Sequence, residues 1–447
     1  MQSNVNIEIQ EQRDSEQLAV DCNKRKALID ILNSDDYDPN NPEKLLGVDW
    51  CDRKQTKIRA KYYIGLKWIK ERKSFLYVSP KINNLDFMTM FMHCFDNDCR
   101  DVSSKLGRIY SIDFNAAPIK IDTAQSILTP MLVVHFLKLT EQIVKKGLKF
   151  NYIQREENLC SKIKGKVLLS QTLKRNYSTG RSDRTMCRYQ DYSIDCIENR
   201  ILKKTLLFIN RFINIYNDIS CSADLKKMTI YCLGAMTTIN DELPLQTMKQ
   251  FKINPLYKEY AEALKVAQLI LRRFSYDIEH IDKESEKSLP PFWIDMSLLF
   301  ELYVYSKLKS AYKHQIDHHI STYGNEIDFV KYDEKVIIDA KYIPLWENNV
   351  HHDNVRQLSG YARNTALRKK ITKIDCDNQT IIDCLIIYPH KDGIDRFPEE
   401  ILIKKEMEIG TYLKFHKLSI KLPTKSNAKQ SNRDRRFAVL QTAATEE

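Results

Sequence analysis

The chain has 447 residues, of which 43% are hydrophobic, and it carries a formal net charge of +11. A chain of this length is too long for one compact core, so we expect two or three domains, and its ordinary apolar content excludes a disordered polymer. The 11 cysteines contain no CxxC pair, which argues against a disulfide framework or a structural zinc site and favours the reducing cytoplasm.

The N-terminal part is expected to be rich in β-structure. Residues 1–45 are polar, and we interpret them as a leader that is not a signal peptide. Residues 58–82 alternate aromatic and β-branched side chains on either side of a charged turn, which predicts two strands. We therefore assign residues 46–118 to a β-rich region, which also contains a helix predicted over 85–97.

The middle of the chain, residues 119–285, is expected to be mainly helical. A helix is predicted over 124–147, and apolar residues recur at helical spacing in 194–217 and around 257–275. The most apolar stretch, ILTPMLVVHFLKL, is too short and too interrupted to span a membrane, so we expect no membrane partner. Charged residues and a double proline in 281–291 then mark a domain boundary.

Residues 286–423 are expected to form a compact α/β domain. The pattern predicts a helix over 293–312, a hairpin over 326–342, a helix over 353–370 and then the apolar strand IIDCLIIYP. This order indicates a mixed sheet, so the whole chain is an α+β multidomain protein. Residues 424–447 are polar and are expected to form a mobile tail.

Three charged residues lie within the apolar hairpin EIDFVKYDEKVIIDAKY. If the chain turns at Asp333 and Glu334, Asp328 lies opposite Asp339, with Cβ atoms about 4.5–5.5 Å apart. Lys341 is two residues beyond Asp339 and therefore shares its face of the sheet. Burying these charges is costly unless a partner or a metal compensates for them.

The charged set matches the needs of phosphodiester hydrolysis. Two facing carboxylates repel each other, and a hard cation such as Mg²⁺, which takes oxygen ligands, removes that repulsion. A nearby ammonium group can orient water and stabilise charge that develops on a phosphoryl group. The D-x(10)-D-x-K spacing is that of PD-(D/E)xK nucleases. A surface hairpin with a cross-strand Asp/Lys pair is the alternative explanation of an isolated match.

Residues on the neighbouring helices favour the nuclease interpretation. Glu301 lies on an otherwise apolar helix face before the hairpin, where it could be a further metal ligand. Gln357 and Tyr361 are four residues apart and share one face of the following helix. That helix is basic, and its arginines are candidates for phosphate contacts: Arg356, Arg363 and Arg368. The net charge fits a nucleic-acid partner, although lysine is common throughout the chain.

Other motifs carry less weight. The histidines of HQIDHH (314–319) are discounted as zinc ligands, since HExxH is absent and we expect them on loops or exposed faces. No GxxxxGK[ST] motif occurs, so the chain is not expected to hydrolyse nucleotides itself.

Several segments in order along the chain resemble the McrC family, the nuclease subunit of McrBC-type restriction systems specific for 5-methylcytosine. The segments FLYVSPKINNLDFMTMF, IKGKVLLSQTLKRN and DYSIDCIENRILKKTLLF are similar to its N-terminal and middle elements. The segment PFWIDMSLLFELYV resembles the helix that enters its nuclease domain, and EIDFV, VIIDAKY and RQLSGYA resemble the nuclease core.

The resemblance implies a Mg²⁺-dependent DNA endonuclease that acts on modified DNA with a separate McrB-like AAA+ GTPase, which the N-terminal region would contact. Asp328, Asp339, Lys341 and Gln357 then take the catalytic positions. The metal would be held by Asp328, Asp339, the Ala340 carbonyl and Glu301, while Tyr361 and the three arginines would contact DNA. Two other functions stay open: a non-catalytic activator of the AAA+ partner, and a nuclease of the same fold in transposition or repair.

Overall fold

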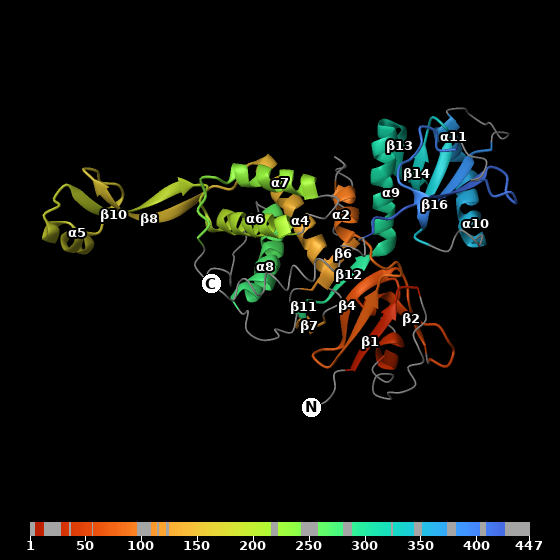
Figure 1. Cartoon of the computed structure of the whole chain (residues 1–447), viewed down its shortest axis with the longest axis horizontal. Helices are drawn as coiled ribbons and strands as arrows, with labels where there is room; N and C mark the ends of the chain where they lie inside the picture. Colours follow the sequence, from red (N-terminus) through yellow and green to blue (C-terminus); the bar gives the residue numbers. More distant parts are fainter. Residues whose placement is uncertain are drawn as a thin grey trace. The chain divides into compact units, whose positions relative to one another are not determined.

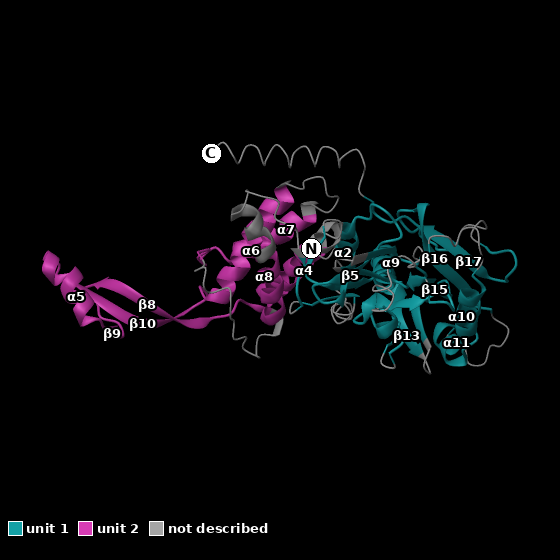
Figure 2. Cartoon of the chain, turned by 90° about the horizontal axis from the view of Figure 1, so that it is seen from below, with its two compact units in different colours: residues 1–128, 284–447 teal, residues 129–283 magenta. Residues whose placement is uncertain are grey.

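The structure is a computed structural model that divides the chain into two compact units (Figures 1 and 2). Unit 1 comprises residues 1–128 and 284–447, and unit 2 comprises residues 129–283. The structure describes residues 5–12, 28–34, 37–55, 57–95, 109–113, 116–121, 125–215, 222–242, 258–279, 288–322, 325–343, 351–372, 381–402 and 408–424. No helix among these residues is long and apolar enough to cross a membrane.

Unit 1 contains a five-stranded sheet built from both ends of the chain. Its order is β1 (Val5–Gln10), β5 (Ser74–Ser79), β4 (Tyr63–Lys70), β12 (Phe292–Asp295) and β6 (Tyr110–Ile112). The two strands predicted within residues 58–82 are confirmed as β4 and β5, which pair in antiparallel fashion. A further short strand, β3 (Ile58–Ala60), pairs with β2 (Val48–Trp50). Part of the expected leader is therefore structural, because β1 pairs along its length with β5.

The helix expected from residue 293 begins three residues later. Residues 292–295 form β12, which pairs with β4, and α9 extends over Met296–Tyr312. The Asp295 side chain accepts hydrogen bonds from the N–H groups of Ser297 and Leu298 and so caps the helix. β12 approaches β4 closely at Gly65, which has φ +142°, because a Cβ there would lie 2.2 Å from the Phe292 oxygen.

The other helices follow the sequence pattern closely. In unit 1, α2 extends over Phe87–Phe95, and the Cys94 thiol contacts the Leu299 carbonyl of α9 at 3.8 Å. The longer helices described in the middle region are α4 (Gln125–Lys146), α6 (Ile197–Ile215), α7 (Ser222–Ala235) and α8 (Lys258–Glu279). Helices α2, α4, α6 and α8 confirm the predictions over 85–97, 124–147, 194–217 and 257–275, whereas α7 was not predicted.

A polar network ties α6 and α8 of unit 2 to the segment after α4. The Asn199 side-chain Nδ2 donates to the Lys149 backbone carbonyl at 2.9 Å, and the Tyr260 hydroxyl donates to Asn199 Oδ1 at 2.7 Å. The Lys149 ammonium forms an ion pair of 2.6 Å with Glu198. Arg200 pairs with Asp195, also at 2.6 Å. The segment DYSIDCIENRILKK therefore has a structural role in this unit.

Unit 2 also carries a three-stranded sheet that the sequence pattern does not predict. β8 (Asn151–Cys160) and β10 (Arg184–Ser193) pair along their whole length, and the short β9 (Lys166–Val167) adds to β10. Figure 1 shows β8 and β10 as a long ribbon that leads to α5 (Leu169–Arg175). Residues of β8 alternate between exposed and half-buried, so this strand lacks the apolar alternation that identifies a strand packed on a core.

The C-terminal part of unit 1 is a mixed sheet, as expected. Its order is β13 (Ile316–Thr322), β14 (Asn325–Lys331), β15 (Val336–Ala340), β16 (Asp383–Ile394) and β17 (Phe415–Ile420). The first three strands are antiparallel, and the pairs β15/β16 and β16/β17 are parallel. Apart from Thr424, the expected tail at 424–447 lies outside the described residues.

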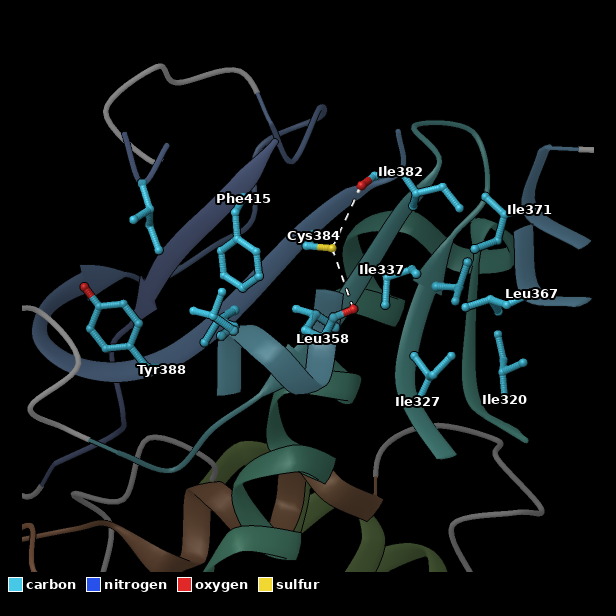
Figure 3. Packing of buried hydrophobic residues seen from close by; sticks show 14 residues of the cluster. Ile320, Ile327, Ile337, Leu358, Leu367, Ile371, Ile382, Cys384, Tyr388 and Phe415 are labelled. Carbon is cyan, nitrogen blue, oxygen red and sulfur yellow. Dashed lines mark hydrogen bonds between the residues drawn. The ribbon is translucent and has the colours of Figure 1, made fainter. Parts of the chain in front are cut away.

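The two faces of this sheet pack against different helices. On one face, Val330, Ile337 and Ile386 form a buried cluster with Leu358 and Leu367 from the two helices that follow the hairpin (Figure 3). On the opposite face, Phe329 stacks on Tyr305 of α9, with ring centroids 5.9 Å apart. The sheet is therefore covered on both faces.

The single helix predicted over 353–370 is two helices, α10 (His352–Ala362) and α11 (Thr365–Thr372). The break lies at Asn364, whose side-chain oxygen accepts a hydrogen bond of 3.1 Å from the Leu367 N–H. An asparagine in this position caps the second helix. The basic residues of 353–370 are therefore divided between two helices and the link that joins them.

Candidate active site

The two aspartates of the hairpin lie on neighbouring strands: Asp328 in the middle of β14, and Asp339 one residue before the end of β15. Phe329 pairs with Ile338 and Lys331 pairs with Val336, with a four-residue turn between the strands. The next step of this register places Asp328 opposite Asp339. The Ala340 N–H donates a hydrogen bond of 2.8 Å to Asp328 Oδ2, which fixes that carboxylate at the strand end.

Lys341 is the centre of the polar contacts at this strand end. Its Nζ lies 3.0 Å from Asp339 Oδ2 and donates to Gln357 Oε1 at 3.3 Å. The Gln357 side chain in turn donates to the Tyr361 hydroxyl at 2.9 Å. The structure therefore brings Asp328, Asp339, Lys341 and Gln357 together from two strands and one helix.

The site has an excess of buried negative charge. Burial, the Asp339 charge and the Glu301 charge raise the pKa of Asp328 well above its ordinary value. Burial also raises the pKa of Asp339, although the Lys341 ammonium opposes the change. Burial acts against the ammonium of Lys341, but the Asp339 and Asp328 carboxylates outweigh it and raise the pKa of Lys341. One lysine does not neutralise this set of acids.

The residues present fit a hard divalent cation. Asp339 Oδ2 is buried and accepts no hydrogen bond from the part of the chain that the structure describes, although Lys341 is within ion-pair distance. Asp339 is buried and Asp328 is half-buried, and both have raised pKa values, so the pair favours a nearby positive charge; Mg²⁺ takes such oxygen ligands. The Asp pair is therefore suited to a cation.

Glu301 meets two histidines next to this site. Its Oε1 lies 2.9 Å from His318 Nε2 and 2.7 Å from His319 Nε2. Burial by itself would raise the pKa of Glu301, but hydrogen bonds from His318 and His319 lower it to about 2. His319 Nδ1 lies 2.8 Å from Glu326 Oε1. These residues form a separate cluster of nitrogen and oxygen atoms.

This cluster corrects our expectation that the histidines lie on loops or exposed faces. His318 and His319 belong to β13, and their side chains are only 4% and 21% exposed. His314 fits the expectation, since it lies in a short 3₁₀ helix and is exposed. The sequence spacing gives no sign of the cluster, because consecutive strand residues normally point to opposite faces.

The DNA-binding candidates lie on the two helices after the hairpin. Arg356 on α10 is 79% exposed, with Asp353 3.3 Å away, and Arg363 directly follows α10 and is also exposed. Arg368 on α11 is half-buried. Tyr361 is half-buried and is held by Gln357.

A lysine two residues after β5 contacts the residue that follows Lys341, and the sequence pattern gives no sign of this contact. The Lys81 ammonium donates to the Tyr342 carbonyl and lies 3.8 Å from the centroid of the Tyr342 ring. It also donates to Gln12 at 2.7 Å and lies 3.7 Å from the buried Glu11. Since Tyr342 follows Lys341, this contact connects the two sheets of unit 1 at the candidate site.

Comparison with known proteins decides the family. The model of the family described as McrBC 5-methylcytosine restriction system component matches residues 58–370, which is well over half of the chain. The chain belongs to this family. The McrBC match includes Asp328, Asp339, Lys341 and Gln357, and it confirms the resemblance noted in the sequence. A comparison with curated proteins finds no match.

Two solved structures of McrBC assemblies are similar to the chain. One is a refined half-complex from a tetradecameric assembly of Thermococcus gammatolerans McrB AAA+ hexamers with bound McrC. It has 17% identity and a TM-score of 0.39, and the match covers 97% of this chain and 100% of that one. The other is a Thermococcus gammatolerans McrBC complex, with 16% identity, a TM-score of 0.30 and coverage of 68% and 87%. The family assignment rests on the family match alone.

Proposed function

We propose that this chain is the DNA endonuclease subunit of a modification-dependent restriction system, and that it requires Mg²⁺. The observation that carries the proposal is the convergence of Asp328, Asp339, Lys341 and Gln357 at one strand end. The mixed sheet between α9 and α10 then serves as a PD-(D/E)xK core. Membership in the McrBC family supports the assignment to restriction.

Asp328, Asp339 and the Ala340 carbonyl would hold the cation. Glu301 is the fourth proposed ligand, and its charge contributes to the raised pKa of Asp328. A divalent cation supplies Lewis-acid activation of the phosphate and of water. The carboxylates of Asp328 and Asp339 would place the charge of the cation at the end of the hairpin.

Lys341 would orient the attacking water and stabilise the negative charge that develops on the phosphate. Gln357 keeps the ammonium in position, since its side-chain oxygen accepts from Lys341 Nζ at 3.3 Å. Asp339 Oδ2 contacts the same ammonium at 3.0 Å. The lysine is thus held between two side chains.

The partners of the proposed reaction are modified DNA and an AAA+ GTPase. The similar Thermococcus gammatolerans structure contains McrB AAA+ hexamers with bound McrC, and we propose a McrB-like partner for this chain. The chain contains no GxxxxGK[ST] motif, so GTP hydrolysis would belong to the partner. Arg356, Arg363, Arg368 and Tyr361 would contact the DNA, and the reaction would take place in the cytoplasm.

Cleavage of methylated plasmid tests this function. The full chain is combined with its McrB-like partner, GTP and Mg²⁺, and we expect cleavage of methylated DNA that Asp339→Asn abolishes. Asp392→Asn is a matched control, because Asp392 is an exposed acid of β16 in the same sheet. Unchanged cleavage by Asp339→Asn would support a non-catalytic activator instead. Cleavage by the chain alone, without partner or GTP, would favour a nuclease of transposition or repair.

A further inference from the structure

Glu301, His318 and His319 form a cluster that shares only Glu301 with the proposed Mg²⁺ site. Both Nε2 atoms face the same carboxylate oxygen, at 2.9 and 2.7 Å. The three ligand atoms all lie within 4.8 Å of one another. Two imidazoles and one carboxylate form a donor set that zinc enzymes use, and it leaves a coordination position open.

The backbone of β13 is distorted at this point. His319 has φ +51°, in the left-handed region that non-glycine residues seldom adopt. Strand pairing continues from His318/Phe329 to Ile320/Ile327, and no pair forms at His319. This local break lets two consecutive side chains reach the same helix. Such a conformation costs free energy and persists where the surroundings hold it, often at functional sites.

Neighbouring side chains hold both rings in place. The His318 ring stacks against Tyr305, with centroids 4.3 Å apart, and against Phe329, at 5.3 Å. His319 Nδ1 is 2.8 Å from Glu326 Oε1, which orients Nε2 toward Glu301. A carboxylate on the far nitrogen of a histidine is the usual support of a metal-binding imidazole. The cluster therefore has the oriented ligands of a metal site.

We propose that Glu301, His318 and His319 bind a transition-metal ion, with Zn²⁺ as the preferred class. Imidazole nitrogen favours Zn²⁺ over Mg²⁺, which prefers oxygen ligands. Ligands about 2.1 Å from a tetrahedral ion lie roughly 3.4 Å apart, so each ring needs to move by less than about 1 Å. Glu301 is the residue common to both proposed sites, whereas the histidines belong only to this one. The site does not require that the chain be a nuclease.

Zn²⁺ titration of the metal-free full chain tests the proposal. The chain is treated with a chelator, and binding is followed by calorimetry with Zn²⁺ and by absorption with Co²⁺ as a spectroscopic probe. His318→Phe keeps the aromatic stack while it removes the ligand, and His319→Ala removes the second ligand. Glu326→Gln removes only the support of His319. His314→Ala is the matched control, since His314 is an exposed histidine of the same segment.

We expect one equivalent of Zn²⁺, with nitrogen-ligand bands in the Co²⁺ spectrum. Glu326→Gln should weaken binding by about 10-fold, and His318→Phe and His319→Ala should weaken it further. His314→Ala and Asp339→Asn should bind as the wild type does. Absence of saturable binding, or full affinity in both histidine variants, would overturn the proposal. Loss of Zn²⁺ binding in Asp339→Asn alone would do the same, since it would assign the ion to the Asp pair.

A circular dichroism spectrum of each variant checks folding. If a histidine variant fails to fold, Glu326→Gln decides the matter, because it leaves every proposed ligand in place. Loss of DNA cleavage in Asp339→Asn with Zn²⁺ binding intact would show that the two sites are separate. Failure of the proposed nuclease function would leave the Zn²⁺ result unaffected.

Discussion

The Asp328 carboxylate accepts a hydrogen bond of 2.8 Å from the Ala340 N–H, across the hairpin. Ala340 lies between Asp339 and Lys341 in the chain, so this one bond ties the first acid to the strand that carries the other two groups. The hairpin by itself thus places all three charged side chains at one end of the sheet.

Replacement of Asp328 by asparagine should stabilise the metal-free protein. The pKa of Asp328 is raised by burial and by Asp339 and Glu301, so its stabilising contribution is greatest at low pH and is lost as the pH rises through the raised value. At pH 8 without metal, Asp328→Asn should therefore increase the free energy of unfolding by about 0.5–2 kcal/mol. Thermal melts at pH 8 and pH 5 measure this, and a less stable variant at pH 8 would contradict it.

Mg²⁺ should stabilise the wild type and not this variant. An ion that binds only the folded state at 100 times its Kd adds about 2.7 kcal/mol. Melts with and without Mg²⁺ at pH 8 should show this gain for the wild type and almost none for Asp328→Asn. An equal gain in both proteins would remove Asp328 from the metal site.

Gln357→Ala should slow DNA cleavage by roughly 10- to 100-fold. The variant removes the oxygen that accepts from Lys341, and a hydrogen bond to a charged group contributes about 1.5–3 kcal/mol. Tyr361→Phe is the matched control, because it removes only the next contact and should cost less than Gln357→Ala. Single-turnover cleavage rates measure both. Equal rates for Gln357→Ala and the wild type would show that Lys341 needs no such support.

Arg356→Gln and Arg363→Gln should each weaken DNA binding by similar amounts on all sequences. Both side chains are exposed, so they are suited to phosphate contacts. Log affinity falls as log salt concentration rises, and each variant should make this negative slope shallower by about 1. Arg396→Gln, an exposed arginine beyond β16, is the control and should leave the slope unchanged. Unchanged slopes in both Arg356→Gln and Arg363→Gln would place the DNA on another surface.

Glu11 should make stability depend on pH. Burial raises the pKa of Glu11 from its ordinary value of 4.5 to about 7, so its contribution is complete below pH 4.5 and is lost as the pH rises to about 7. This corresponds to up to about 3 kcal/mol at 1.36 kcal/mol per pKa unit. Burial lowers the pKa of Lys81 from 10.5 to about 8. Its effect on stability has the opposite sign, so the free energy of unfolding should increase as the pH rises from about 8 to 10.5.

The free energy of unfolding between pH 4.5 and 7, measured with urea, tests this for the wild type and Glu11→Gln. The fall with pH should be smaller in the variant, because glutamine does not titrate. The same fall in both proteins would show that Glu11 is not the group responsible.

Gly65→Ala should be strongly destabilising. A Cβ there would lie 2.2 Å from the Phe292 oxygen, and φ is +142°, so β4 and β12 would have to separate. We expect a loss of about 2–4 kcal/mol. Gly234→Ala in α7 is the control, since no atom lies within 4 Å of its Cβ position, and alanine there should stabilise by up to about 1 kcal/mol. Thermal melts compare the two, and a harmless Gly65→Ala would mean that the strands can move apart.

Local patterns in the sequence were enough for the parts of the site that lie close together in the chain. Strand alternation and a turn at Asp333 and Glu334 predict that Asp328 lies opposite Asp339, and helical spacing predicts that Gln357 and Tyr361 share a face. These relationships depend on backbone periodicity, which is a property of each short segment. Most helices were predictable for the same reason, although α5 and α7 were not predicted and α10 and α11 were predicted as one helix.

Other features depended on tertiary structure, because they join segments far apart in the chain or break the local period. Glu301 meets the two histidines only because β13 lies against α9 and the backbone at His319 reverses the usual alternation. Lys81 reaches Tyr342 across the boundary between two sheets. The polar strands β8 and β10 pair with each other without an apolar face to identify them. The sequence by itself thus determined the order of Asp328, Asp339 and Lys341 along the hairpin, and only tertiary packing decided which other charged side chains they meet.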